Sequence, residues 1–271
     1  CEVLQNPLQT YEVKLNCRNL TTRKYISDIA RSRKVMTMDA DIQVTSELKK
    51  RLLIIGAGGF GREVLQWAQD IQAQGRVDWE VGGFLDANAR ALGNFDIDLP
   101  ILGSPETWQP DVNDRFVCVI GDPTTRLRIC RELLGRGANF VTLIHPSAIV
   151  GSRCSIGDGA ILCPHVTVTV DVMIGDFVIL NVRSSVGHDA QVGDGCTVNS
   201  FCDITGNATL GEGVFLGSHS SVTPSASIGD YARVGAGSVV VRRVRANTTV
   251  MGPTAKRIDW KAEPSASSDA A

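Results

Sequence analysis

The chain has 271 residues, of which 43% are hydrophobic, and its formal net charge at pH 7 is −2. This length suits two globular domains, and the near-neutral charge gives no electrostatic case for binding nucleic acid or a membrane surface. No apolar run reaches the roughly 18–20 residues that a membrane-spanning helix needs. The eight cysteines have no metal-ligand spacing, so we expect reduced thiols, a cytoplasmic location and no bound metal.

The N-terminal segment, residues 1–49, differs in composition from the rest of the chain. It begins with Cys1, carries scattered Arg and Lys residues, and has no apolar stretch of the kind found in secretory signals. We interpret residues 1–49 as a disordered leader or an over-extended gene model, with Met36 or Met38 as a natural start. We assign this segment no function.

Residues 50–145 alternate between strand-like and helix-like segments. Strands are expected at 51–55, 79–85, 97–102, 116–120 and 140–144, and helices at 62–71, near 104–106 and at 124–134. Such alternation is typical of a parallel sheet with helical crossovers. We therefore predict a Rossmann-like α/β domain over residues 50–145.

A glycine-rich turn separates the first expected strand from the first expected helix. Glycines there let the backbone approach a phosphate or sugar closely, and the helix N-terminus offers unpaired N–H groups to an anion. An acidic residue at the end of the second strand is suited to accept hydrogen bonds from a ribose or sugar hydroxyl. The predicted nucleotide-sugar site consists of Gly56, Gly58, Gly59, Gly61 and Asp86.

Two other interpretations of this turn stay open. It could be a tight turn that serves only packing. It could also belong to a nicotinamide dinucleotide site, although roughly 95 residues make a small domain for a dinucleotide.

From Val150 to about Val240 the sequence repeats every six residues. Every sixth position is aliphatic, and the residue two positions before it is small or Val. A period of six fits neither an α-helix nor one long strand, but it is typical of a β-helix, a coil of short strands with a corner every six residues. Three hexads make one triangular coil, so positions three hexads apart should stack at roughly 4.8 Å.

Both repeating positions are expected to point into the coil, where Cys154, Cys196 and Cys202 would act as small core residues. Gly often follows the aliphatic residue, and we expect it to relieve the backbone at the corner. A β-sandwich is the alternative, but its turns would not keep an unbroken phase of six. We predict a parallel β-helix with a C-terminal closure over residues 146–258 and a flexible tail over 259–271.

The register of the repeat predicts where the histidines of the coil lie. His165 and His219 are separated by a whole number of coils, so we expect them in one surface column. His145 lies at the joint between the domains, where a structural role is favoured over a place in a cleft. His188 lies at a corner and is followed by Asp189, and a neighbouring carboxylate can orient an imidazole and support general-base catalysis.

Together these features resemble the bacterial sugar O-/N-acyltransferase family, which includes UDP-amino-sugar N-acetyltransferases and sialic acid O-acetyltransferases. The resemblance covers about residues 51–258. It is carried by the segments 53–64 (LIIGAGGFGREV), 83–86 (GFLD), 120–121 with Arg126, 144–146 (IHP), Asn181, 186–189 (VGHD) and 251–256 (MGPTAK).

The resemblance implies a left-handed coil, acetyl-CoA as co-substrate, and a homotrimer with sites between neighbouring subunits. It implies that His188 deprotonates the sugar amine or hydroxyl as it attacks the thioester, that Asp189 supports His188, and that Asn181 helps to hold the site or the acceptor. Lys256 belongs to the closure over coenzyme A. In register, Gly206 lies one coil beyond His188, and its N–H is suited to stabilise the thioester oxyanion.

Three positions depart from the family pattern. Phe60 stands where a His is common, Thr197 stands where a second His often lies, and the closure reads Pro253-Thr254-Ala255. These differences bear on the acceptor and on coenzyme A binding rather than on the reaction class.

We therefore expect an acetyl-CoA-dependent N- or O-acetyltransferase that acts on a nucleotide-linked sugar, with UDP-amino sugars favoured. Two alternatives stay open. One is an acyltransferase of a non-nucleotide acceptor such as sialic acid or serine, and the other is a non-catalytic trimer that binds nucleotide-sugars. The intact pair of His188 and Asp189 favours catalysis.

Overall fold

The computed structural model describes residues 50–75 and 77–252. Four predictions concern residues outside this part of the chain. They are the interpretation of residues 1–49, the closure from Pro253 onward, the role of Lys256 and the tail over 259–271.

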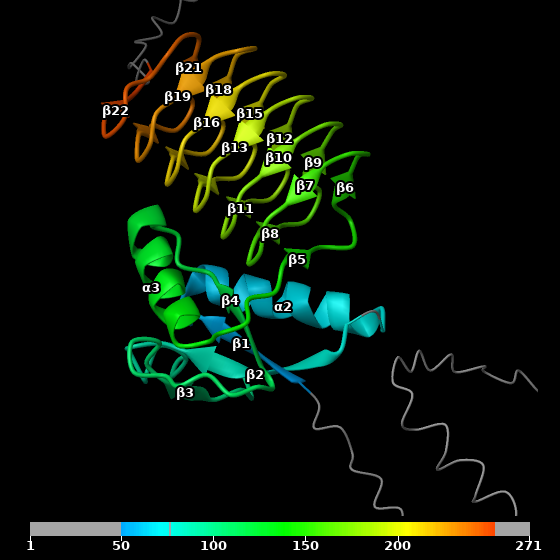
Figure 1. The fold of residues 1–271 in the computed structure, drawn as a ribbon. Helices are drawn as coiled ribbons and strands as arrows, with labels where there is room; N and C mark the ends of the chain where they lie inside the picture. Colours follow the sequence, from blue (N-terminus) through cyan, green and yellow to red (C-terminus); the bar gives the residue numbers. More distant parts are fainter. Residues whose placement is uncertain (1–49, 76, 253–271) are drawn as a thin grey trace, which may run out of the picture. The chain divides into compact units, whose positions relative to one another are not determined.

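The first domain is a parallel sheet with two helices (Figure 1). Its strands β1 (Lys50–Ile55), β2 (Trp79–Leu85), β3 (Ile101–Gly103) and β4 (Asp114–Cys118) lie in the order β3-β2-β1-β4. Helix α2 (Gly59–Ala73) follows β1, and α3 (Pro123–Gly135) follows β4. The aliphatic residues of β1 are fully buried, as expected of a strand that is covered on both faces of a parallel sheet.

Two elements of this domain were predicted wrongly. Within the expected strand 97–102 only the end is extended and paired, as β3. The expected helix near 104–106 is a turn, in which the N–H groups of Thr107 and Trp108 both donate to the carbonyl of Ser104. Pro110 follows shortly afterwards, and a proline disfavours helical backbone in the residue before it.

The expected strand 140–144 is divided between the two parts of the chain. Phe140 forms only an isolated bridge with Phe116, whereas β5 (Leu143–Ile144) pairs with β8 (Ile161–Leu162) of the second domain. The register explains this difference, because Ile144 lies one hexad before Val150. The aliphatic column therefore begins one hexad earlier than predicted.

The second domain is a solenoid of two-residue strands in three parallel sheets, coiling from β5 to β22 (Figure 1). We name each sheet by its first strand. The β5 sheet contains β5, β8, β11 (Ile179–Leu180), β14 (Thr197–Val198), β17 (Phe215–Leu216), β20 (Arg233–Val234) and β22 (Thr249–Val250). The β6 sheet contains β6 (Ile149–Val150), β9 (Thr167–Val168), β12 (Ser185–Val186), β15 (Asp203–Ile204), β18 (Ser221–Val222) and β21 (Val239–Val240). The β7 sheet contains β7 (Ser155–Ile156), β10 (Met173–Ile174), β13 (Gln191–Val192), β16 (Thr209–Leu210) and β19 (Ser227–Ile228).

Strand pairing follows the predicted register of three hexads. Ile161 pairs with Ile179, and Ile179 pairs with Thr197. From Leu162 to Val240 every member of the aliphatic column is buried, and so is every member of the small column that lies two residues before it. Val150, in the first strand of its sheet, is 39% exposed. The predicted interior of the coil is thus confirmed for all but its first turn.

The glycines that follow the aliphatic column are explained by close packing between coils. A Cβ at Gly187 would lie 2.6 Å from the backbone nitrogen of Gly206 in the next coil. Positive φ angles occur two residues later, either at Gly or at other residues such as Phe177 (56°) and Asp189 (60°). Our expectation that these glycines relieve backbone strain at the corner was therefore wrong. Glycine is needed at these positions because a side chain would collide with the backbone of the next coil.

We expect Val198→Ala to lower the free energy of unfolding by about 2 kcal/mol, because Val198 is fully buried in the coil. Val150→Ala is the matched control, since it removes the same atoms from the same column at a partly exposed position. We expect it to lower the free energy of unfolding by less than about 1 kcal/mol. Urea unfolding of both variants measures the difference, and equal losses would contradict a packed solenoid interior.

Candidate active site

His188 and Asp189 form a hydrogen-bonded pair at a corner of the solenoid. They follow β12 at the corner between the β6 and β7 sheets, and Nδ1 of His188 lies 2.8 Å from Oδ2 of Asp189. Their side chains are 60% and 55% exposed, respectively. A carboxylate acceptor favours the neutral tautomer with the proton on Nδ1, which leaves the lone pair on Nε2 free to take a proton.

Gly206 lies against the free edge of this imidazole. A Cβ built on Gly206 would lie 2.6 Å from both Nε2 and Cε1 of His188. The coil that carries Gly206 is hydrogen-bonded to the coil that carries His188, because the N–H of Asn207 donates to the carbonyl of His188 at 2.8 Å. The N–H of Gly206 itself donates to no acceptor within residues 50–75 and 77–252. The corner therefore combines a proton acceptor with a neighbouring backbone donor, the pairing that acyl transfer requires.

Asn181 is not brought to His188 within a single chain. It follows β11 in the β5 sheet, at a different corner of the coil from the one that carries His188. Its side-chain oxygen accepts a hydrogen bond from the N–H of Val182 at 2.7 Å, and its own N–H donates to Val198. The structure thus gives Asn181 a local role at its own corner, and its predicted contact with an acceptor stays a prediction.

The glycine-rich turn lies at the carboxyl end of β1. Gly56 has a φ of +107°, and a Cβ at Gly61 would lie 2.1 Å from the carbonyl oxygen of Gly56, so both glycines are needed to form the turn. Added Cβ atoms at Gly58 and Gly59 would meet nothing closer than 3.9 Å. The packing interpretation therefore explains Gly56 and Gly61, whereas Gly58 and Gly59 leave space for a ligand at the N-terminus of α2.

Asp86 stabilises this turn from the end of β2. Its Oδ2 accepts a hydrogen bond from the N–H of Ala57, and its Oδ1 accepts one from Asn88, each at 2.8 Å. This role in holding the turn was not apparent from the sequence. Because β1 pairs with both β2 and β4, the strand order reverses beside this turn, which is where open α/β sheets bind their ligands.

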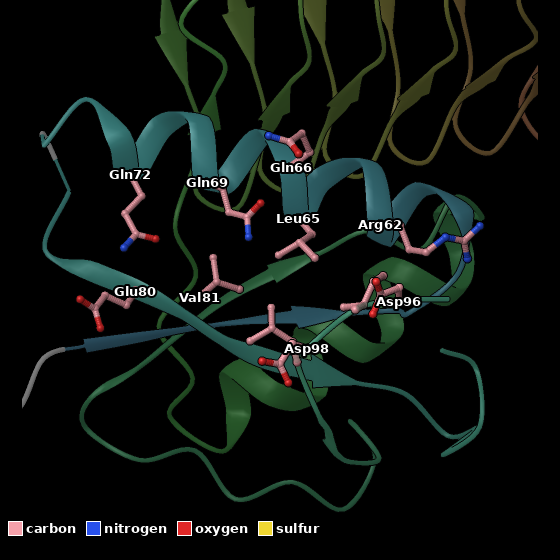
Figure 2. A pocket seen from close by; sticks show the side chains of 11 residues that line it. Arg62, Leu65, Gln66, Gln69, Gln72, Glu80, Val81, Asp96 and Asp98 are labelled. Atoms are coloured by element: carbon pink, nitrogen blue, oxygen red, sulfur yellow. The ribbon is translucent and has the colours of Figure 1, made fainter. Parts of the chain in front are cut away.

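A cavity of about 590 Å³ lies beside α2 (Figure 2), and neither His188 nor Gly58 nor Gly59 is among the residues that line it. It runs between α2 and β2, and residues 96–99 close one side. Its lining includes glutamines from α2 and the acidic residues Asp96 and Asp98, while Arg62 at one end also stacks over the ring of Phe95. We assign this cavity no role in the reaction.

The remaining histidines lie where the register placed them. His165 and His219 are exposed, and His219 stacks on Phe201 with ring centroids 4.9 Å apart. Nδ1 of His145 accepts the N–H of Ser147 at 3.1 Å, which fits the structural role favoured for this residue.

Two kinds of structural feature are absent from the described ranges. No helix within residues 50–75 and 77–252 combines the length and apolar character needed to cross a membrane. The same residues contain no cluster of three or more side chains suited to hold a metal ion.

Comparison with known proteins identifies the family. Residues 51–133 match the model of the PglD N-terminal domain, and residues 207–242 match the bacterial transferase hexapeptide model. A perosamine N-acetyltransferase from Caulobacter crescentus, solved with CoA and GDP-perosamine, has 30% sequence identity and a TM-score of 0.66. The similarity covers 74% of this chain and 93% of that one. The chain belongs to the hexapeptide-repeat sugar acyltransferases.

Another acyltransferase of this type is the acetyltransferase domain of PglB from Neisseria gonorrhoeae. It is 25% identical with a TM-score of 0.68, over 77% of this chain and 100% of that domain, and it has also been solved with acetyl coenzyme A. The GDP-perosamine N-acetyltransferase of Escherichia coli O157:H7 is 30% identical over 120 residues, or 44% of this chain. That match spans 53% of the curated relative, about half of its length. The predicted fold class, an α/β domain followed by a left-handed β-helix, is confirmed.

Proposed function

We propose that this acyltransferase transfers an acetyl group from acetyl-CoA to the amine of a nucleotide-linked sugar. The observation that carries the proposal is the placement of His188 Nε2 against Gly206, with Asp189 on Nδ1. The relatives support the amine as acceptor, because those described above are N-acetyltransferases or acetyltransferase domains.

In the proposed reaction the sugar amine attacks the thioester carbonyl directly. Nε2 of His188 takes a proton from the attacking nitrogen, and the carboxylate of Asp189 stabilises the imidazolium that forms. The N–H of Gly206 donates to the oxyanion of the tetrahedral intermediate, a contribution often worth about 3 kcal/mol. The C–S bond then breaks, and the imidazolium returns the proton to the departing thiolate.

The acceptor would bind in the first domain. Gly58 and Gly59 would receive the nucleotide phosphates at the N-terminus of α2, with Gly56, Gly61 and Asp86 holding the turn. From sequence we favoured UDP-amino sugars. The relatives favour a GDP-linked amino sugar, since one of them was solved with GDP-perosamine and another is named for it.

The proposed enzyme is a cytoplasmic homotrimer. Because Asn181 and His188 lie at different corners of one coil, only a neighbouring subunit could bring an Asn181 to a His188. The predicted place of Lys256 in a closure over coenzyme A belongs to the same proposal. Sedimentation velocity measures the oligomeric state. A monomer would contradict the proposal, because no neighbouring subunit would then complete the site around His188.

The proposal is tested by a panel of acceptors with acetyl-CoA, in which free thiol is measured as it is released. We expect release with GDP- or UDP-linked amino sugars and none with serine or free sialic acid. The preferred nucleotide should also raise the melting temperature. Turnover of serine or sialic acid alone would favour the non-nucleotide alternative. A nucleotide-induced shift without binding of acetyl-CoA in calorimetry would favour a non-catalytic binding protein.

A further inference from the structure

Arg126 is a fully buried arginine whose hydrogen bonds all go to neutral oxygens. It lies in α3 with 0% of its surface exposed. Its Nε donates to the carbonyl of Phe177 at 2.9 Å, and its Nη2 donates to the carbonyls of Gly195 and Cys196 at 2.7 and 3.1 Å. Its Nη1 donates to the carbonyl of Ile120. Burial of a guanidinium is costly, so this extensive set of bonds indicates a specific role for the residue.

These acceptors come from both domains. Ile120 follows β4 in the α/β domain, whereas Phe177, Gly195 and Cys196 belong to two successive coils of the solenoid. Gly195 allows the approach, because a Cβ at that position would lie 2.4 Å from Leu127 of α3. Arg126 therefore joins the loop after β4 to the solenoid through a buried contact.

Thr197 extends the same connection. Its hydroxyl oxygen accepts a hydrogen bond from Nη2 of Arg126 at 2.9 Å, and the hydroxyl donates to the carbonyl of Gly121 at 2.8 Å. Thr197 is buried in β14 of the solenoid. Two consecutive carbonyls of the loop after β4, those of Ile120 and Gly121, are thus held by one buried arginine and one buried threonine.

This loop stands opposite the glycine-rich turn. A Cβ built on Gly56 would lie 3.1 Å from Cγ2 of Val119 and 3.7 Å from Cγ1 of Ile120, and the N–H of Val119 donates to the carbonyl of Ile55. An added Cβ at Gly121 would meet nothing within 4 Å. The loop therefore borders the space between the ends of β1 and β4, where a nucleotide-sugar is expected.

We propose that Arg126 and Thr197 are positioning residues for the acceptor. They fix the loop after β4, which forms one side of the nucleotide-sugar site, to the solenoid. The amine of the bound sugar is thereby directed toward the corner that carries His188 and Gly206. This inference rests on the proposed function. Phe177 of the solenoid also packs in one apolar cluster with Leu127, Ile129 and Cys130 of α3, but apolar packing does not fix the carbonyls of the loop after β4. The ion pair of Arg131 with Glu212 is exposed, and exposed pairs contribute little to rigidity.

The test compares Thr197→Val with Thr197→Ser. The Val variant removes the hydroxyl and leaves the carbonyl of Gly121 without its donor, while Arg126 keeps its carbonyl partners. We expect kcat/KM for the nucleotide-sugar to fall about ten-fold, with KM for acetyl-CoA unchanged within about two-fold. The Ser variant keeps the hydroxyl and should retain most of the wild-type value.

Two control variants separate positioning from general stability. Thr142→Val removes a hydroxyl that donates to the carbonyl of Gly157 at another corner, in the first coil of the solenoid, and Arg131→Ala removes an exposed connection of α3. Both should keep wild-type kinetic constants. Arg126→Lys is a second positioning variant, which should raise KM for the nucleotide-sugar more than Thr197→Val does.

A Thr197→Val enzyme that melts at a lower temperature but keeps its kcat/KM for the nucleotide-sugar would overturn the positioning role. If wild-type protein transfers no acetyl group at all, the proposed function fails instead. Calorimetric titration with GDP and UDP then tests the inference without turnover. Weaker nucleotide binding by the Val variant would support it, and equal binding would reject it.

Discussion

His188→Ala is expected to lower kcat/KM for acetyl transfer by about 10²–10⁴-fold, because it removes the group proposed to take the proton from the acceptor amine. The side chain is 60% exposed at its corner, so its removal leaves no cavity in the solenoid. The melting temperature should therefore stay within about 1–2 °C of the wild-type value. Initial rates of thiol release and thermal unfolding of the same preparation measure both quantities.

The matched control is His219→Ala, which removes an exposed histidine from another corner of the solenoid. We expect it to keep wild-type activity. Comparable turnover by the His188→Ala and wild-type enzymes would exclude His188 as the general base. A large fall in activity of both variants would point to a disturbed solenoid rather than to lost proton transfer.

Gly206→Ala is expected to lower kcat by about 10–100-fold without unfolding the protein. The added Cβ would lie 2.6 Å from Nε2 and Cε1 of His188 and 3.1 Å from Cδ2, so the imidazole must move away. That movement would break the hydrogen bond between Nδ1 and Asp189 and would cover the N–H of Gly206. The displaced group is the end of an exposed side chain, so we expect little loss of stability.

Gly135→Ala serves as the control, because a Cβ at the end of α3 would meet nothing within 4 Å. Its kcat should equal that of the wild type. Wild-type activity of Gly206→Ala would show that the corner tolerates a methyl group, and the oxyanion role would then have to be given to another donor.

The solenoid was largely predictable because its information is local and repeated. Each hexad carries the same aliphatic and small residues, so one register sets the direction of every side chain, and an error at one position is corrected by the next. The register even implied the place of β5, because Ile144 lies one hexad before Val150. We had nevertheless assigned that segment to the α/β sheet, since a short aliphatic run fits either neighbour equally well.

The glycines show where local patterns mislead. We attributed the Gly after each aliphatic residue to corner conformation, although the positive φ angles occur two residues later. The demand for glycine comes instead from the next coil, as at Gly187 beneath Gly206. A contact one full coil away constrains that residue, and its immediate neighbours in the chain do not reveal it.

The sequence by itself determined the α/β domain, the coil, its three-hexad register and the corner that carries His188 and Asp189. Only the tertiary structure decided that Nε2 of His188 faces Gly206 and that Arg126 joins the domains through carbonyls of Ile120 and Gly195. The physical reason is that the register specifies direction around a coil, whereas contacts between domains depend on how two folded surfaces pack. The buried guanidinium of Arg126 donates to backbone carbonyls. Every residue has a backbone carbonyl, so no pattern of side chains in the sequence predicts this contact.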